Sequence, residues 1–405
     1  MLDYRILDWK LIGSALLLSL IGIVIIMTSQ HGADSELMRT FYVRQSYWLI
    51  IAFIIFAVII HMPPRLFDFS AYLVYAVSII LLILVLFIGS SRMGATRWIS
   101  LGVLNFAPSD IAKLTLILAL SRFLAYTKLQ VASKRRLAIT IIMTIIPMIL
   151  ILKQPDLGTS VVFPVILFSL WFWSGLSPWY LILILSPLAS LVVASHIVAW
   201  VIYFIVLILF LLFLKPGVLF SVVVVITNLA GGTVLPFIWN RLADYQKLRI
   251  LTFLDPGRDP RGAGYQIIQS KIAVGSGGVF GKGIFEGSQT RLEFLPERHT
   301  DFIFSVLGEE FGMWGALIVL ILFGIIFYRA VMIAFRCRSR FASNVVMGAT
   351  FMLLFQLFVN VGMTLGFMPV TGLALPFLSY GGTSLVLSWS LIGLIVLTDY
   401  HWQEY

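Results

Sequence analysis

Residues 11–28 read LIGSALLLSLIGIVIIMT and contain no charged side chain. A helix needs about 20 mainly apolar residues to cross a bilayer. This stretch is too long for the core of a signal peptide, and no small-x-small cleavage site follows it. We therefore expect residues 11–28 to form a transmembrane helix that is retained in the protein.

The same apolar pattern recurs along the 405 residues, of which 60% are hydrophobic and only 11% charged, with a mean hydropathy of +1.03. Soluble domains carry about 25% charged residues, so an ordinary soluble domain is excluded. We predict an all-α polytopic membrane protein, one integral membrane domain over 1–405 with 10–12 transmembrane helices. The candidate ranges are 11–28, 46–61, 71–89, 109–126, 137–152, 157–175, 178–195, 197–214, 218–238, 302–328, 344–366 and 377–397.

The net charge of +10 follows from basic residues in short loops and calls for no nucleic-acid partner. Cytoplasmic loops of membrane proteins are enriched in Lys and Arg. If both termini are cytoplasmic, thirteen basic residues of the short segments face the cytoplasm and its anionic lipids, and five face outward. This topology places the long polar loop 241–301 on the outer face.

The loop 241–301 holds 16 of the 46 charged residues of the chain. Residues Tyr265–Val274 are apolar at near-helical spacing, which predicts a short helix on the membrane surface. The glycine-rich run 275–283 does not match a phosphate-binding loop, and we interpret it as a flexible turn. Its backbone amides and Lys282 remain candidates for contact with a lipid phosphate.

The loop ends in Leu295-Pro296-Glu297-Arg298-His299-Thr300-Asp301, directly before an apolar run. Asp301 lies where water gives way to lipid, and burial there would make its carboxylate a better base near neutral pH. The alternative is that Asp301 is the N-cap of the next helix.

Asp110 and Lys113 are one helical turn apart in an otherwise apolar segment. Ionisable residues inside a span are costly and indicate function. The alternative is a structural ion pair at the start of a helix.

Further candidates lie in three other loops. Arg92 and Arg97 are suited to a pyrophosphate, and Trp98 to stacking on a sugar or anchoring at the membrane interface. Residues 154–159 (Gln-Pro-Asp-Leu-Gly-Thr) resemble a turn with a cap, and residues 375–384 (LPFLSYGGTS) favour close helix packing. The five histidines are scattered, so we predict no zinc site. A divalent cation, Mg²⁺ or Mn²⁺, held loosely by carboxylates and a substrate phosphate stays open.

Together these stretches resemble the SEDS family (shape, elongation, division and sporulation). The resemblance rests on 94–98, 108–113, 154–159, 296–303 and the Pro-x-x-Ser-Tyr-Gly-Gly-Thr-Ser motif of 376–384, in that order. Gly262-Ala263-Gly264-Tyr265-Gln266 and Arg298 are more similar to the elongation member than to the division member.

The resemblance implies a peptidoglycan glycosyltransferase that polymerises lipid II on the outer face of the bacterial cytoplasmic membrane. It also implies a partner, a class B penicillin-binding protein that crosslinks the strands. By motif, Asp301 occupies the family's essential aspartate. Other positions of expected weight in substrate binding are Arg97, Trp98, Asp110, Lys113, Asp156, Lys282, Glu293 and His299.

Two features depart from the family pattern. The family usually has Glu where this chain has Asp110. It also has ten spans, with two between the Gln-Pro-Asp motif and the large loop, whereas this chain has four candidates there. We therefore expect an extra transmembrane hairpin within 178–215.

Two other functions remain open from the residues alone. A lipid II flippase would suit the many spans and the intramembrane Asp110 and Lys113. A scaffold that only activates a penicillin-binding protein is the second alternative.

Overall fold

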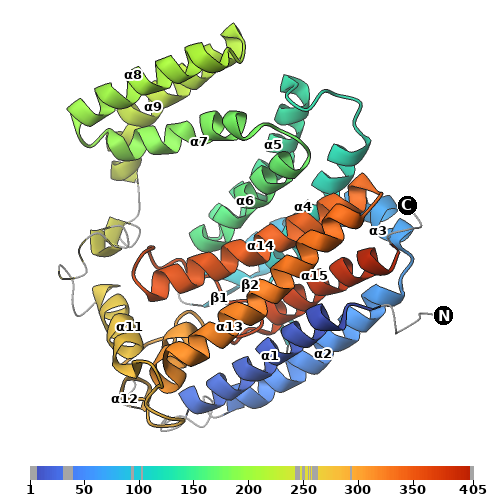
Figure 1. Ribbon diagram of the computed structural model, residues 1–405, viewed down its shortest axis with the longest axis vertical. Coiled ribbons are helices and arrows are strands. Elements are labelled where there is room, and N and C mark those ends of the chain that lie inside the picture. The colour runs from blue at the N-terminus through green and yellow to red at the C-terminus, as the bar shows by residue number, and fades with distance from the viewer. Residues whose placement is uncertain are drawn as a thin grey trace. The chain divides into compact units, whose positions relative to one another are not determined.

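The computed structural model describes residues 7–30, 40–92, 95–101, 104–241, 247–248, 251–253, 255, 257, 263–291 and 294–401. The chain is nearly all helical, and each of the twelve predicted ranges overlaps a long helix (Figure 1). The helices are α1 (Trp9–Ser29), α2 (Phe41–His61), α3 (Pro64–Ile88), α4 (Pro108–Tyr126), α5 (Lys134–Leu152), α6 (Leu157–Trp173), α7 (Pro178–Val193), α8 (Ile197–Leu214), α9 (Val218–Arg241), α11 (Ala263–Gly277), α12 (Ser288–Arg291), α13 (Ile303–Arg336), α14 (Arg340–Thr364) and α15 (Gly382–Tyr400).

Eight of the described helices are long and apolar enough to cross a membrane: α1, α2, α3, α5, α8, α13, α14 and α15. The helices α6 and α7, and residues 218–233 of α9, are apolar but shorter. The predicted polytopic membrane fold is confirmed, although fewer helices meet the criteria of length and apolar composition than the 10–12 spans expected. Helix α4 is not among the eight, and it carries three charged residues, Asp110, Lys113 and Arg122.

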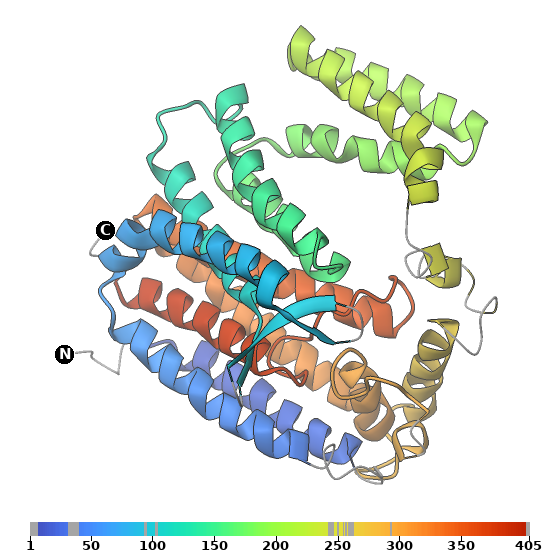
Figure 2. The same cartoon turned by 180° about the vertical axis from the view of Figure 1, so that it is seen from behind.

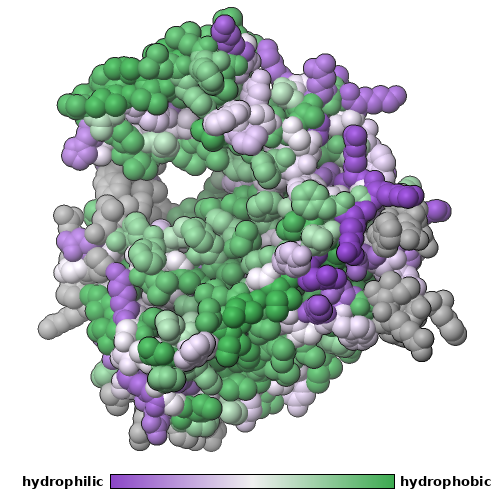
Figure 3. Space-filling model, viewed as in Figure 1, coloured by the Kyte–Doolittle hydropathy of each residue, from purple (hydrophilic) through white to green (hydrophobic). Residues whose placement is uncertain are grey.

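The chain packs as two compact units, the first formed by Met1–Leu170 and Thr252–Tyr405 and the second by Trp171–Leu251. In the second unit, the buried Asn228 of α9 donates to Ser186 of α7 at 2.8 Å and accepts from Tyr203 of α8 at 2.7 Å. Hydrogen bonds of this kind hold helices together in lipid, where the hydrophobic effect does not. The predicted hairpin 178–215 corresponds to α7 and α8, and apolar side chains cover the visible face of α8 (Figure 3).

In the first unit, α15 packs closely on α2, and α1 packs on α13. Trp389 of α15 lies edge-on to Phe53 and Phe56 of α2 and donates to Ser19 of α1 at 3.1 Å. This buried indole therefore joins three helices around a single polar contact, as expected for a buried Trp, whose N–H needs a partner.

A small sheet between α3 and α4 was not predicted. Strands β1 (Ser90–Arg92), β2 (Ala95–Leu101) and β3 (Leu104–Phe106) form an antiparallel sheet in the order β1-β2-β3. The sheet lies beside α3 and α4 (Figure 2). The short strands carry no long hydrophobic alternation, which is why the sequence did not reveal them.

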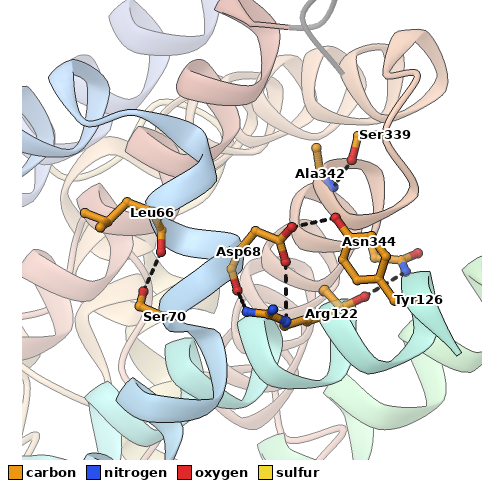
Figure 4. Close-up of polar contacts among 9 residues, drawn as sticks. Leu66, Asp68, Ser70, Arg122, Tyr126, Ser339, Ala342 and Asn344 are labelled. Atoms are coloured by element: carbon orange, nitrogen blue, oxygen red, sulfur yellow. Dashed lines mark hydrogen bonds and ion pairs between the residues drawn. The ribbon is translucent and has the colours of Figure 1, made fainter.

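At one end of the first unit, charged side chains join helices that are distant in the sequence. Arg122 of α4 donates to the backbone carbonyl of Asp68 in α3, and its Nε lies 3.6 Å from the Asp68 carboxylate (Figure 4). Arg329 of α13 pairs with Asp8, the N-cap of α1, at 2.5 Å. Asp399 of α15 is within electrostatic reach of this pair. The start of α1 and the end of α15 therefore lie at the same end of this unit.

Helix α13 is interrupted at Gly312, whose φ of 63° lies in the left-handed region. The break frees main-chain groups on both sides of it. The carbonyls of Glu309 and Glu310 accept from the amides of Lys282 and Gly283, and the amides of 313 and 314 donate to the carbonyls of 278 and 279. The glycine-rich run is therefore fixed to α13 by four main-chain hydrogen bonds, and the predicted flexible turn is a tightly held one.

Gly277 allows the backbone of α11 to lie directly against the backbone of α13. A Cβ at 277 would lie only 1.9 Å from the Gly308 carbonyl oxygen. We expect Gly277→Ala to lower the free energy of unfolding by about 1–3 kcal/mol, the usual cost of overpacking. Thermal unfolding of the purified protein in detergent measures this.

Gly275→Ala on the same helix is the matched control, since a Cβ at 275 meets no atom within 4 Å. It should leave stability unchanged or raise it slightly through helix propensity. Equal effects of the two substitutions would contradict the close approach.

Candidate active site at the start of α13

The segment before α13 is a tight turn organised by Glu297. Glu297 has a φ of 50°, and its carbonyl accepts from the amides of Thr300, Asp301 and Phe302. The Thr300 hydroxyl also donates to the Glu297 carboxylate at 3.1 Å. Arg298 is buried and donates to the carbonyl of Ser29 at the end of α1, at 2.7 Å. This arginine therefore anchors the turn to α1.

Three consecutive carbonyl groups of this turn are held by other parts of the chain. The His299 carbonyl accepts from the Tyr380 amide at 2.9 Å, and the Thr300 carbonyl accepts from the Ser379 hydroxyl at 2.6 Å. The Asp301 carbonyl accepts from the side-chain amide of Asn360 in α14 at 3.1 Å. The Ser-Tyr-Gly-Gly motif, for which packing was the favoured interpretation, thus fixes the backbone that carries Asp301.

The N-cap interpretation of Asp301 is wrong. Helix α13 starts at Ile303, its N-cap is Phe302, and this cap uses no side-chain hydrogen bond. Asp301 lies one residue outside the helix and is partly buried. A Cβ on Gly372 would lie 3.6 Å from its Oδ2 atom, so the carboxylate borders the loop between α14 and α15.

The Gln-Pro-Asp motif reaches the same loop from α6. A Cβ on Gly158 would lie 2.0 Å from the carbonyl oxygen of Thr371, one residue before Gly372. The Asp156 carboxylate accepts from the amide of Thr159 at 3.1 Å and from its hydroxyl at 2.9 Å. Asp156 therefore caps α6, as the residues alone suggested, and this cap lies near Asp301.

The predicted pair in α4 forms: Lys113 Nζ lies 2.6 Å from the Asp110 carboxylate, and the lysine is buried. Helix α4 runs antiparallel to α14, because Asn344 contacts Ser121 while Gly348 contacts Ile117. The pair therefore lies toward the C-terminal end of α14, the end that holds Asp301.

Two other predicted site residues lie in the sheet. Trp98 is in β2, partly buried, and Arg97 precedes it in the same strand. Glu293 lies outside the described residues.

Lys282 does not point toward Asp301 but binds a carboxylate two helical turns along α13. Its Nζ lies 2.8 Å from Glu309, which is fully buried and also accepts from the Ser288 hydroxyl at 3.2 Å and the Gln289 amide at 3.0 Å. Glu309 was not among the predicted site residues, although an acidic residue within an apolar run indicates function.

The ring of His299 packs against Phe41 and Tyr380, with centroid distances of 4.8 and 5.8 Å, and these two rings stack on each other at 4.6 Å. Burial lowers the pKa of His299 below the usual 6.5, a shift that the Glu297 charge opposes and the Arg298 charge reinforces. The imidazole is therefore neutral at pH 7 and part of an aromatic cluster.

Comparison with known proteins identifies the family. A family model described as a cell cycle protein, FtsW/RodA/SpoVE, matches residues 8–203 and 188–404. The chain belongs to the FtsW/RodA/SpoVE family. The resemblance to SEDS proteins is thereby confirmed. The two matching segments overlap at 188–203, within α7 and α8, where the extra hairpin is predicted.

Members of the FtsW/RodA/SpoVE family resemble this chain over nearly its whole length. The peptidoglycan glycosyltransferase MrdB of Escherichia coli K12 is 36% identical over 387 residues, covering 95% of this chain and 92% of MrdB. A chain from a structure on the coordination of polymerization and crosslinking by a peptidoglycan synthase complex has a TM-score of 0.71 at 30% identity. The match covers 98% of this chain and 99% of that chain. The crystal structure of the rod-shape-determining protein RodA of Thermus thermophilus has a TM-score of 0.66 at 27% identity, covering 99% of each.

Ser379→Ala should loosen the turn that carries Asp301 in this family member. It removes the donor to the Thr300 carbonyl and the acceptor that binds the Leu375 amide at 2.8 Å. Leaving buried polar groups unpaired costs about 1–3 kcal/mol. We expect faster hydrogen–deuterium exchange at the amides of Asp301 and Phe302.

Ser390→Ala serves as the control, because the Ser390 hydroxyl donates only to Val386 within its own helix. Unchanged exchange at 301–302 in Ser379→Ala would contradict the role given to this hydroxyl.

Acidification should destabilise the aromatic cluster around His299. Because burial lowers the pKa of His299, the unfolded chain binds its proton more tightly, so stability falls as the pH drops through about 6.5. Unfolding temperatures between about pH 7.5 and pH 5.5 measure this. His299→Phe keeps the ring packing and should reduce the pH dependence; identical profiles would refute the assignment.

Proposed function

We propose that this protein is a peptidoglycan glycosyltransferase that polymerises lipid II into β-1,4-linked glycan strands during cell elongation and shape maintenance. Membership of the FtsW/RodA/SpoVE family supports the proposal. The relative MrdB, 36% identical, is named a peptidoglycan glycosyltransferase. The elongation role is supported by the similarity to MrdB and RodA rather than by the geometry of the site.

The observation that carries the proposal is the fixation of Asp301. Its backbone carbonyl and the two before it are each held by a hydrogen bond from outside the turn. A catalytic base must be held in place to be effective, because misplacement by about 1 Å costs as much as a hundredfold in rate. A carboxylate fixed at the end of a membrane helix is suited to a reaction on a lipid-linked sugar.

In the proposed reaction, the 4-hydroxyl of the N-acetylglucosamine of an acceptor lipid II attacks C1 of the N-acetylmuramic acid at the end of the growing chain. Asp301 takes the hydroxyl proton. The new C1–O4 bond forms as the bond from C1 to the pyrophosphate oxygen breaks, and the anomeric centre inverts from α to β. Undecaprenyl pyrophosphate leaves with the bonding electron pair.

The remaining predicted residues surround this chemistry in the proposal. Trp98 and His299 offer faces to sugar rings, and Asp156 fixes the start of α6 beside Asp301. The Lys113–Asp110 pair supplies charge in α4, and Arg97 stays a predicted contact for the pyrophosphate. Lys282 acts indirectly, through its contact with Glu309.

Dependence on Mg²⁺ or Mn²⁺ is a separate question. Among the described residues, no three His, Cys, Asp or Glu side chains lie where they could hold a metal ion. Asp110 and Asp156 already contact Lys113 and Thr159. These residues do not fit a metal site built from protein alone, and we propose no step through a metal.

We further propose that both termini are cytoplasmic and that Asp301 faces outward. The meeting of the α1 start and the α15 end at one end of the first unit supports this topology, because the N-terminal end of α13 lies away from Arg329. The expected partner is a class B penicillin-binding protein, supported by the likeness to a chain of a peptidoglycan synthase complex.

Asp301→Asn should reduce polymerisation by about 10²–10⁴-fold, the usual contribution of a general base. The assay follows glycan strands made from labelled lipid II in liposomes, with and without the partner. Glu286→Gln, at an exposed carboxylate of the same loop, is the control and should keep wild-type activity.

A folded Asp301→Asn protein that polymerises at nearly the wild-type rate would refute the role of the base. Movement of labelled lipid across the bilayer without any glycan strands would favour a flippase.

A further inference from the structure

The proposed reaction expels a pyrophosphate, and a cation near Asp301 would stabilise its charge. Several basic residues predicted or found near the site contact other groups of the protein. Lys113 pairs with Asp110, Lys282 pairs with Glu309, and Arg298 donates to the Ser29 carbonyl. Each of these three cations is therefore already engaged by a protein group, and none is an obvious contact for a phosphate.

Helix α11 brings another lysine to the site. Its buried Ser270 hydroxyl lies 2.6 Å from the Ser305 hydroxyl and donates to the Thr364 carbonyl at 2.6 Å. Ser305 lies one helical turn after Asp301, and Thr364 lies one turn after Asn360, which holds Asp301. Ser270 therefore joins α11 to α13 and α14, in each case about one turn, or 5.4 Å along the axis, from residues 301 and 360. Lys271 follows Ser270 in α11.

The side chain of Lys271 lies over Gly366, at the end of α14. A Cβ on Gly366 would come within 2.1 Å of Lys271 Cε and 2.6 Å of Nζ, and Gly366 has a φ of 75°. Only glycine suits both constraints. The loop that begins at Gly366 continues to Gly372, which borders the Asp301 carboxylate. The ammonium and the carboxylate therefore line the same short loop.

Lys271 is exposed, and no ion pair or hydrogen bond joins it to another residue that the structure describes. The end of this exposed side chain, Cε and Nζ, lies against Gly366. An ammonium group in this position is suited to a phosphate, to which ammonium groups bind as point charges. The glycine beneath it makes this more than a solvated surface lysine.

We infer that Lys271 binds the pyrophosphate of the lipid-linked substrate at the bond that breaks. This inference rests on the proposed function. As the C1–O bond breaks, the electron pair and negative charge move onto the pyrophosphate, which the Lys271 ammonium contacts. The proton from the attacking hydroxyl goes to Asp301.

The first test compares Lys271→Met, Lys271→Arg and Lys128→Met in the liposome polymerisation assay over a range of lipid II concentrations. We expect Lys271→Met to lower kcat/KM by about 10- to 100-fold, the value of a charge-assisted hydrogen bond. Lys271→Arg should restore most of it. Lys128→Met removes the same charge from an exposed lysine after α4 and should match wild type.

A second variant displaces the ammonium without removing it. Gly366→Ala places a methyl group where the lysine side chain lies, and it should reduce kcat/KM in the same direction as Lys271→Met. The double variant should then be little worse than Lys271→Met alone, because both changes act on one contact. Additive losses would overturn the inference.

Direct binding separates this inference from the proposed function. Wild type should bind undecaprenyl pyrophosphate more tightly than undecaprenyl phosphate, and Lys271→Met should reduce that difference. If wild type polymerises lipid II and Lys271→Met does so equally well, the inference is overturned and the proposed function stands. If wild type makes no glycan, the proposed function fails, and equal binding of undecaprenyl pyrophosphate by both proteins overturns the inference separately.

Liposomes with and without phosphatidylglycerol identify the source of the phosphate. A loss of activity in Lys271→Met that is the same in both supports the substrate pyrophosphate. A loss confined to liposomes with phosphatidylglycerol means that Lys271 binds bulk anionic lipid, and overturns the inference.

Discussion

The candidate site depends on hydrogen bonds to three successive backbone carbonyls, those of His299, Thr300 and Asp301. Their donors come from two segments, Asn360 in α14 and residues 379–380 before α15. These hydrogen bonds join the turn, the end of α14 and the last loop, and pairing of main-chain carbonyls favours their forming together. The Asn360 side chain extends this unit by also donating to the Leu373 carbonyl at 2.8 Å. The backbone that carries the carboxylate is thus held in part by the Ser379 hydroxyl and the Tyr380 amide, more than 70 residues away in sequence.

The helices could be predicted because lipid leaves few choices. Backbone groups in the bilayer core must be satisfied within the segment, so apolar stretches of sufficient length become helices. The twelve ranges predicted from hydropathy therefore all coincide with helices. The same rule gives no information about strands β1, β2 and β3, since their residues carry neither helical nor alternating apolar spacing.

The candidate site was predicted less completely than the fold. The sequence indicated Asp301, the Gln-Pro-Asp motif and the Asp110–Lys113 pair as separate candidates, and the structure brings the first two to one loop. The sequence did not indicate which side chains hold the site together by hydrogen bonds. Ser379 and Asn360 act through contacts between segments distant in the chain, and no local pattern reveals such contacts. For Glu309, the sequence carried a signal but not the identity of its partner, Lys282. The assignment of catalytic and binding roles stays a prediction.

The attachment of loop 278–283 at the interruption of α13, at Gly312, affects which residues of this loop can change over evolution. Loop 278–283 is fixed to α13 by four main-chain hydrogen bonds, whose amide and carbonyl groups do not depend on the side chain, and by the Lys282–Glu309 ion pair. Its side chains at 279 and 280 are exposed and take no part in the attachment. The surface chemistry of this loop can therefore diverge between species, to suit different neighbours in the cell envelope, while the backbone beneath it keeps one position relative to the carboxylate.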